Sequence, residues 1–457
     1  MTNEACGIGT VGGDLDCLVN SLREKGIKID APAKWSHEDK PLRKHVEECW
    51  EFARKLIDML KLSEKVKKLC YSLCVTHDLG KLDPEWEISK VMQKKLRIPH
   101  SARSFEFAKS LEENLLTVLL PKNYHPIMLF SVLTHHTSLD VMKIANSPEW
   151  RKVRSFLKNG NKEIIIDASD AIGIFKLADM ISAAGLHQEF SDLVLQQYEW
   201  SKDFERRIGR GIVNKAKSVR GLFDKEKFMV QSEVAGTKQK HLAVIAPTGW
   251  GKTALAILRT SKIKPKKIFY CLPTITAIKD FSDSLKKMFG IESVGEYFYF
   301  ADVEHFKQEE TSEVTYPINF HRYFVPKITI TTVDQMLMTA IQVGKYHMRR
   351  FNFRDALMIF DEFHLLTPQM VGILKAFLEQ LADVYNLSIL LMSATPSELY
   401  LKEFEECLEN KGGFSCKRLH QEYKSLKRHK IKHHSEGILD FIQENPSIFR
   451  GKGRILV

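Results

Sequence analysis

The N-terminal part of the chain has apolar residues at helical spacing. They recur at three- and four-residue steps across 46–60 and again across 66–73, which places them along one face of a helix. Similar spacing continues from Pro41 to about Trp200. The pattern predicts an all-α domain in this half of the chain.

From Phe228 onward, the spacing changes to short apolar runs with helix-like stretches between them, at 242–245, 268–272, 328–332, 357–360 and 389–392. Short buried strands that alternate with helices are typical of a doubly wound parallel sheet. The fold class we expect is therefore α + α/β. Between the two patterns, residues 201–227 are rich in lysine and arginine. We expect a solvated basic connector there rather than a phosphate-binding segment.

Composition adds constraints on compartment and partners. A length of 457 residues allows two or three domains, and a net charge of +11 suits a polyanionic partner such as a nucleic acid. The eight cysteines form no Cys-x-x-Cys pair, which predicts buried thiols in a reducing compartment. There is no basic, apolar leader and no run of about 18 apolar residues. We expect a cytoplasmic protein with no membrane contact.

A glycine-rich loop follows the first predicted strand. Glycines let backbone N–H groups approach phosphates, a lysine reaches the terminal phosphates, and a hydroxyl binds Mg²⁺. The residues expected to bind ATP here are Thr248, Gly249, Gly251, Lys252 and Thr253.

A second motif, Asp361-Glu362-Phe363-His364, follows another predicted strand. Asp361 would hold the Mg²⁺ of the nucleotide, and Glu362 would orient the attacking water. Two glycine turns and an unrelated acidic cluster would be the alternative interpretation. The strand-to-loop setting of both motifs favours a site for ATP with magnesium.

Further hydroxyl and amide side chains follow other predicted strands. Parallel sheets bind ligands beyond the carboxyl ends of their strands, so these residues are expected to serve the same site. Ser393, Thr395 and His364 would couple the nucleotide to a bound strand, whereas Thr274, Thr332 and Gln335 would contact a nucleic-acid backbone. Taken in order, the motifs resemble those of superfamily 2 helicases across about 228–396. Gln231 occupies a position at which some members of that family place an adenine-reading glutamine.

The helical half holds a set of histidines and carboxylates. His77-Asp78-Leu79-Gly80-Lys81 ends a predicted amphipathic helix, and further candidates are His45, His100, His135, His136 and Asp179. Imidazoles that share a carboxylate suit two divalent transition metal ions, which activate water near neutral pH. The plainer interpretation is that some of the chain's 17 histidines lie here by chance.

The pattern resembles the HD phosphohydrolase superfamily across about 41–200. The resemblance implies that His45, His77, Asp78 and Asp179 hold the first metal, and that His100, His135 and His136 hold the second with Asp78 shared. It also implies a catalytic role for Asp78 and for Lys81, which would steady the charge of a scissile phosphate. Manganese, nickel, cobalt and iron are the candidate metals, with magnesium as a further candidate.

An HD domain followed by this helicase half is similar to the signature helicase-nuclease of type I CRISPR systems. The resemblance implies an HD nuclease domain at 1–200, the connector at 201–227, a first RecA-like domain at 228–435 and the beginning of a second at 436–457. It implies single-stranded DNA as substrate and an RNA-guided surveillance complex as partner.

Family members use a second RecA-like domain to complete the ATPase. We therefore expect this polypeptide to bind ATP but to hydrolyse it poorly and not to translocate, with the missing half either truncated or supplied by a separate chain. Two alternatives stay open. One is an HD phosphohydrolase fused to an RNA-remodelling module, and the other is a non-enzymatic docking fragment.

Overall fold

The computed structural model describes residues 11–30, 35–37, 40–86, 98–111, 119–136, 162–184, 187–215, 224–298 and 320–419, with a few positions after 436. The predicted beginning of a second RecA-like domain at 436–457 lies almost entirely outside these ranges. None of the described helices combines the length and the apolar character needed to cross a membrane.

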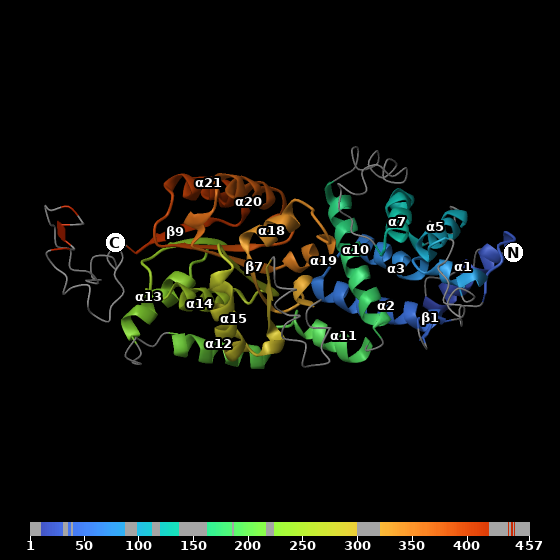
Figure 1. The fold of residues 1–457 in the computed structure, drawn as a ribbon, viewed down its shortest axis with the longest axis horizontal. Coiled ribbons are helices and arrows are strands. Elements are labelled where there is room, and N and C mark those ends of the chain that lie inside the picture. Colours follow the sequence, from blue (N-terminus) through green and yellow to red (C-terminus); the bar gives the residue numbers. More distant parts are fainter. Residues whose placement is uncertain are drawn as a thin grey trace.

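The N-terminal half is helical, as its apolar spacing predicts. Its described helices are α1 (Val11–Glu24), α2 (Leu42–Leu60), α3 (Glu64–Thr76), α5 (His100–Ser110), α7 (His125–Leu133), α10 (Lys162–Ala183) and α11 (His187–Gln196), with short 3-10 turns at η1 (Leu79–Leu82) and η2 (Lys122–Tyr124) and a small ribbon of β1 (Trp35–His37) and β2 (Lys40–Pro41). The long α10 packs against both α2 and α3. These three helices form the frame of the helical half (Figure 1).

The C-terminal half is built on a seven-stranded sheet with the order β5-β6-β4-β7-β8-β3-β9. All neighbouring strands in it are parallel. The strands are β3 (His241–Ile245), β4 (Lys267–Leu272), β5 (Val294–Tyr297), β6 (Ile328–Thr332), β7 (Ala356–Asp361), β8 (Ser388–Ser393) and β9 (Phe414–Arg418). The five predicted strands are confirmed. The edge strands β5 and β9 were missed because their solvent-facing residues break the apolar run.

Helices cover both faces of this sheet. Figure 1 shows α18 (Val333–Ala340), α20 (Pro368–Leu381) and α21 (Glu398–Leu408) on one face, and α12 (Lys202–Lys215), α14 (Lys252–Ile263) and α15 (Thr276–Phe289) on the other, with α13 (Lys225–Ala235) beside α14 and the short α19 (His347–Arg350) toward α10. Side chains of one strand alternate between two apolar clusters: Phe269 joins one and Tyr270 the other. A sheet buried on both faces explains why its strands are almost uniformly apolar.

The predicted solvated connector is wrong for residues 202–215. This segment forms α12, whose apolar side chains Phe204, Ile208 and Ile212 are buried against the sheet layer. An apolar residue recurs at every fourth position of this helix, among the arginines and lysines. The prediction rested on the number of basic residues and overlooked this spacing. The two halves of the chain are therefore linked by a packed helix.

The two halves also meet through α10 and α19. A side-chain carbon placed on Gly173 would lie 2.0 Å from the backbone carbonyl of His347, so glycine permits this close approach. Beside it, Arg354 pairs with the fully buried Asp170 of α10.

The cysteine prediction is only partly confirmed. The free thiols of Cys49, Cys70, Cys74, Cys271 and Cys407 are buried. It is wrong for Cys416, which is an exposed free thiol, and for Cys17, which is disulfide-bonded.

Candidate metal centre and nucleotide site

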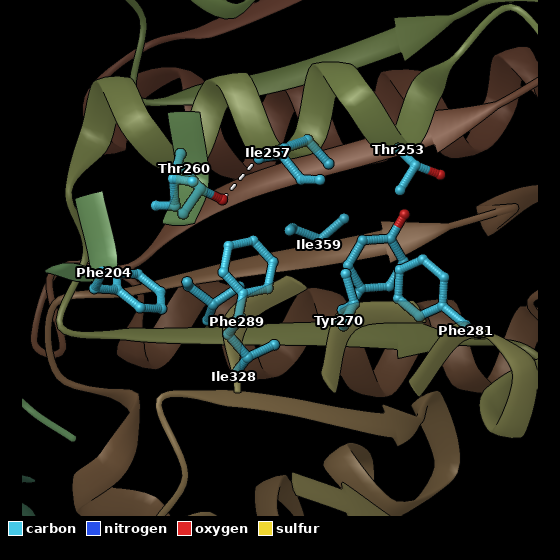
Figure 2. Close-up of a pocket in the computed structure, with 13 residues that line it drawn as sticks. Phe204, Thr253, Ile257, Thr260, Tyr270, Phe281, Phe289, Ile328 and Ile359 are labelled. Atoms are coloured by element: carbon cyan, nitrogen blue, oxygen red, sulfur yellow. Dashed lines mark hydrogen bonds between the residues drawn. The ribbon is translucent and has the colours of Figure 1, made fainter. Parts of the chain in front are cut away.

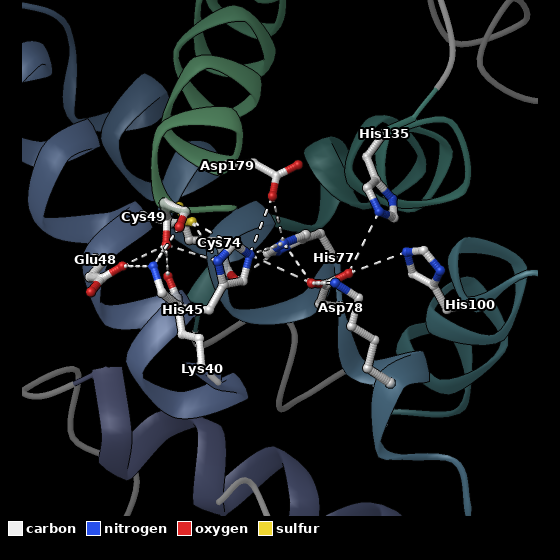
Figure 3. Close-up of polar contacts among 12 residues, drawn as sticks. Lys40, His45, Glu48, Cys49, Cys74, His77, Asp78, His100, His135 and Asp179 are labelled. Carbon is white, nitrogen blue, oxygen red and sulfur yellow. Dashed lines mark hydrogen bonds and ion pairs between the residues drawn. The ribbon is translucent and has the colours of Figure 1, made fainter. Parts of the chain in front are cut away.

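The predicted metal ligands come from five separate segments of the helical half. His45 lies on α2, His77 caps the end of α3, and Asp78 follows it in the turn before η1. His100 begins α5, His135 and His136 follow α7, and Asp179 lies on α10. Figure 3 shows the side chains of these residues other than His136 turned toward one another from these segments.

Asp78 is the centre of the cluster. Its Oδ2 atom lies 3.5 Å from Nε2 of His45 and 3.4 Å from Nε2 of His77, while its Oδ1 atom lies 3.5 Å from Nε2 of His100 and 3.7 Å from Nε2 of His135. Each carboxylate oxygen thus faces two imidazole nitrogens. This arrangement is the one that a carboxylate shared between two metal ions requires.

The other ring nitrogens of these histidines are already occupied. Nδ1 of His77 donates to the Cys74 carbonyl at 3.0 Å and Nδ1 of His135 donates to the Val132 carbonyl at 2.6 Å. Such contacts select the tautomer whose Nε2 atom carries the free lone pair. Among the described residues, Nε2 of His135 has no hydrogen-bond partner. Lone pairs that face a buried carboxylate repel it, and a cation between them removes that repulsion.

The ligand spacing fits a metal ion. Atoms bound at about 2.1 Å to one ion lie roughly 3.0 to 3.4 Å apart in tetrahedral or octahedral geometry. Nε2 of His45 lies 3.2 Å from Nε2 of His77 and 3.2 Å from Oδ1 of Asp179. The three histidines His100, His135 and His136 also bring one nitrogen each within 4.8 Å of one another. The residues present therefore suit two ions.

The charge states of the ligands agree with this fit. Burial alone would lower the pKa of His77, but the nearby carboxylates of Asp78 and Asp179 raise it to about 10. The same carboxylate field attracts a metal cation in place of that proton. Burial lowers the pKa of His135 to about 3 and that of His100 to about 4, so both rings are neutral near pH 7, as metal ligands must be.

Lys81 lies closer to the carboxylate than we expected. Its Nζ atom is 2.6 Å from Oδ2 of Asp78, and the side chain is buried. Burial alone would raise the Asp78 pKa, but the charges of Lys81, His77 and His45 and the hydrogen bond from His77 together hold that pKa well below its usual range. The contact with Lys81 thus helps to keep Asp78 ionised. A direct contact between Lys81 and a phosphate stays a prediction.

Sequence inspection missed a second layer behind the ligands. Nδ1 of His45 lies 2.9 Å from Oγ of Ser182, which donates to Glu48 at 2.8 Å. The Cys49 thiol lies 3.8 Å from Nε2 of His45. Ser182 follows Asp179 by three residues and Cys49 follows His45 by four. Each residue therefore lies about one helical turn from a predicted ligand, and this spacing is the signal by which the sequence could have identified it.

The nucleotide motifs meet at the carboxyl edge of the sheet. Gly251, at a φ of 99°, ends the loop after β3, and Lys252 begins α14. Nζ of Lys252 lies 3.2 Å from Oε1 of Glu362, which follows β7. The loop between Thr248 and Gly251 therefore faces the acidic motif, as the order of the two motifs predicts.

Gln231 supports this loop from α13. Its buried amide donates to the carbonyls of Trp250 and Gly251 at 3.2 and 3.3 Å. A side chain on Gly251 would come within 2.6 Å of that amide nitrogen. The adenine-reading role considered for Gln231 stays a prediction.

The expected coupling residues are in contact. Nδ1 of His364 lies 2.9 Å from Oγ of Ser393 and 3.4 Å from Oε2 of Glu362. The Ser393 hydroxyl also accepts from the backbone N–H of Thr395. These contacts connect the ends of β7 and β8.

The predicted nucleic-acid contacts differ in exposure. Thr274 is exposed and Gln335 is half-buried, but the Thr332 side chain is buried where α18 begins. Burial leaves Thr332 no surface for a direct backbone contact in this conformation. The other two contacts stay predictions.

Comparisons with known proteins agree with this layout. Residues 229–404 match the DEAD/DEAH box helicase family. A putative CRISPR-associated nuclease/helicase Cas3 of Methanocaldococcus jannaschii is 23% identical over 403 residues, which span 72% of this chain and 54% of that protein. The chain is related to the Cas3 nuclease/helicases. The Cas3 of Methanothermobacter thermautotrophicus is 27% identical over 229 residues, 49% of this chain and 25% of that protein.

The fold is also that of a solved Cas3. The crystal structure of T. fusca Cas3-ADP has a TM-score of 0.52 and 16% identity, and the match covers 85% of this chain and 53% of that one. The chain thus spans about half the length of the M. jannaschii and T. fusca proteins. The helicase domain implies ATP with magnesium as its ligand.

Proposed function

We propose that the helical half of this Cas3-related chain is a metal-dependent nuclease that cuts single-stranded DNA. The observation that carries the proposal is the position of Asp78, whose two oxygens face the Nε2 atoms of His45, His77, His100 and His135. The names of its relatives, CRISPR-associated nuclease/helicase Cas3, support nuclease activity. DNA as the substrate and an RNA-guided complex as the partner are what the resemblance to the type I CRISPR helicase-nucleases implies.

Each residue of the centre would have a defined role. His45, His77 and Asp179 would hold one ion, His100, His135 and His136 the other, and Asp78 both. Two bound divalent ions would supply an activated water and offset the charge of the scissile phosphate. Lys81 would hold Asp78 ionised and in place. Manganese, nickel, cobalt and iron are the candidate metals because imidazole-rich sites favour them over magnesium.

In the helicase half, the proposal assigns ATP binding to the loop at 248–253 and to the acidic pair Asp361-Glu362. Lys252 would release Glu362 and bind the terminal phosphates, because a phosphate carries more negative charge than the carboxylate it replaces. Glu362 would then be free to orient a water molecule. Sequence-independent, salt-dependent binding of DNA follows from backbone contacts and the net charge of +11.

Digestion of circular single-stranded DNA with manganese or nickel tests the nuclease. We expect cutting by the full chain, loss of cutting in Asp78→Asn and His135→Gln, and unchanged cutting in Asp58→Asn, which alters an exposed carboxylate on α2. Parallel reactions with RNA and free nucleotides identify a phosphohydrolase. Hydrolysis of those substrates without DNA cutting, or cutting that survives both site variants, would reject the proposal.

A further inference from the structure

A buried tyrosine lies behind the proposed magnesium site. Tyr270 sits in the middle of β4, and its side chain is almost fully buried. Its hydroxyl donates to Oδ2 of Asp361 at the end of β7, at 3.0 Å. The ring is held against Phe281 of α15, with ring centroids 4.3 Å apart. The phenol therefore reaches Asp361 from a rigid position.

The side chain of Thr253 on α14 lies near the same hydroxyl. Its side chain acts on Tyr270 as a hydrogen-bonding group, and this contact partly offsets the burial that raises the Tyr270 pKa. Figure 2 shows the hydroxyls of Thr253 and Tyr270 at the same end of a largely apolar pocket, with the hydroxyl of Thr260 at the other end. The phenol oxygen thus interacts with both side chains that the sequence motifs assign to Mg²⁺.

We propose that Tyr270 is a positioning residue for magnesium, acting through a hydrogen-bond relay from Thr253 to Tyr270 to Asp361. The inference rests on the proposed ATP site. A hydroxyl that offers a lone pair to a cation must direct its proton elsewhere. The phenol oxygen accepts that proton's hydrogen bond, and the phenol donates its own proton to Oδ2 of Asp361.

The relay also orients the carboxylate. Oδ1 of Asp361 accepts from the backbone N–H of Glu362 at 3.0 Å, so both oxygens of the carboxylate have a defined donor. A carboxylate held at both oxygens presents its remaining lone pairs in one direction. Residues that orient metal ligands in this way typically change metal affinity by about 10- to 100-fold when removed.

The chain offers a matched control for loss of a buried phenol. Tyr385 is also fully buried, and its hydroxyl donates to a buried carboxylate, Oδ1 of Asp170, at 3.1 Å. That contact lies where α10 meets the helicase half, away from the nucleotide motifs. Tyr385→Phe removes a comparable hydrogen bond without touching Thr253 or Asp361.

The test measures binding of a fluorescent ADP analogue to the full chain at increasing Mg²⁺ concentration and in EDTA. For Tyr270→Phe we expect the half-saturating Mg²⁺ concentration to rise about 10-fold, with unchanged nucleotide affinity in EDTA. Tyr385→Phe should match the wild type in both measurements.

Two results would overturn the inference in different ways. A wild-type Mg²⁺ requirement in Tyr270→Phe, or an equal loss of affinity with and without Mg²⁺, would show that the phenol has only a packing role. If Lys252→Ala leaves nucleotide affinity unchanged, the ATP-site assignment itself fails, and the relay fails with it.

Discussion

Nε2 of His45 on α2 lies 3.2 Å from Oδ1 of Asp179 on α10. In the proposed metal centre, this pair belongs to one half together with His77, and His100, His135 and His136 form the other half. We expect Asp179→Asn to bind one manganese ion per chain where the wild type binds two, because only the first half loses a charged ligand. Metal analysis after desalting measures this ratio. Retention of two ions would contradict the ligand assignment.

Ser182 holds the ring of His45 from behind, at 2.9 Å from Nδ1. Ser182→Ala should weaken binding of the first ion by about 10-fold, because the ring loses the contact that sets its tautomer. Ser182→Thr, which keeps a hydroxyl, should restore the affinity for the first ion. Ser131→Ala is the control, since that buried hydroxyl donates to the Ile127 carbonyl of its own helix. Equal manganese affinities in Ser182→Ala and Ser131→Ala would disprove the role.

Removal of metal should lower the stability of the helical half. A ligand that binds only the folded state stabilises it by about 2.7 kcal/mol at 100 times its Kd. We therefore expect EDTA to lower the melting temperature and added Mn²⁺ to restore it. Asp78→Asn should show no response to either addition. Thermal melts that are identical with and without Mn²⁺ in the wild type would count against a bound ion.

Arg354 pairs with Asp170 across the junction of the two halves, with Nε and Nη2 at 2.8 and 2.6 Å from Oδ2. Arg354→Ala leaves a fully buried carboxylate without its cation, and we expect a loss of about 3 to 5 kcal/mol. Urea unfolding measures the loss. The double variant Arg354→Met with Asp170→Asn should recover most of the loss, because both charges of this buried pair are then removed.

His241 should make stability depend on pH. Burial lowers its pKa to about 4, whereas an unfolded histidine has a pKa of about 6.5. Between these values the unfolded chain binds more protons, so stability falls as pH drops through this window. The contribution reaches about 3 kcal/mol.

The comparison variant for this test is His241→Gln, which keeps a donor for the Lys411 carbonyl. Urea unfolding of both proteins in EDTA at pH 7.5, 6 and 5 should show a shallower pH dependence in the variant. Parallel pH profiles would show that His241 does not titrate as its burial requires.

Local sequence determined most of the elements and the candidate motifs. Helical spacing in the first half and apolar runs in the second predicted the α + α/β fold. The buried face of a helix and a buried strand each require apolar residues at a characteristic spacing, and that spacing is visible in the sequence. Motifs such as Lys252-Thr253 and His77-Asp78 are recognisable because their chemistry needs residues adjacent in the chain.

Only the tertiary structure decided which side chains meet across helices and strands. The burial of Thr332, the packing of α12, the contact of Lys81 with Asp78, and the position of Tyr270 beside Asp361 all depend on side-chain direction and on segments far apart in the chain. Spacing along one segment carries no information on its distance to another. Long-range packing supplies that distance, and it places Asp179 of α10 beside His45 of α2.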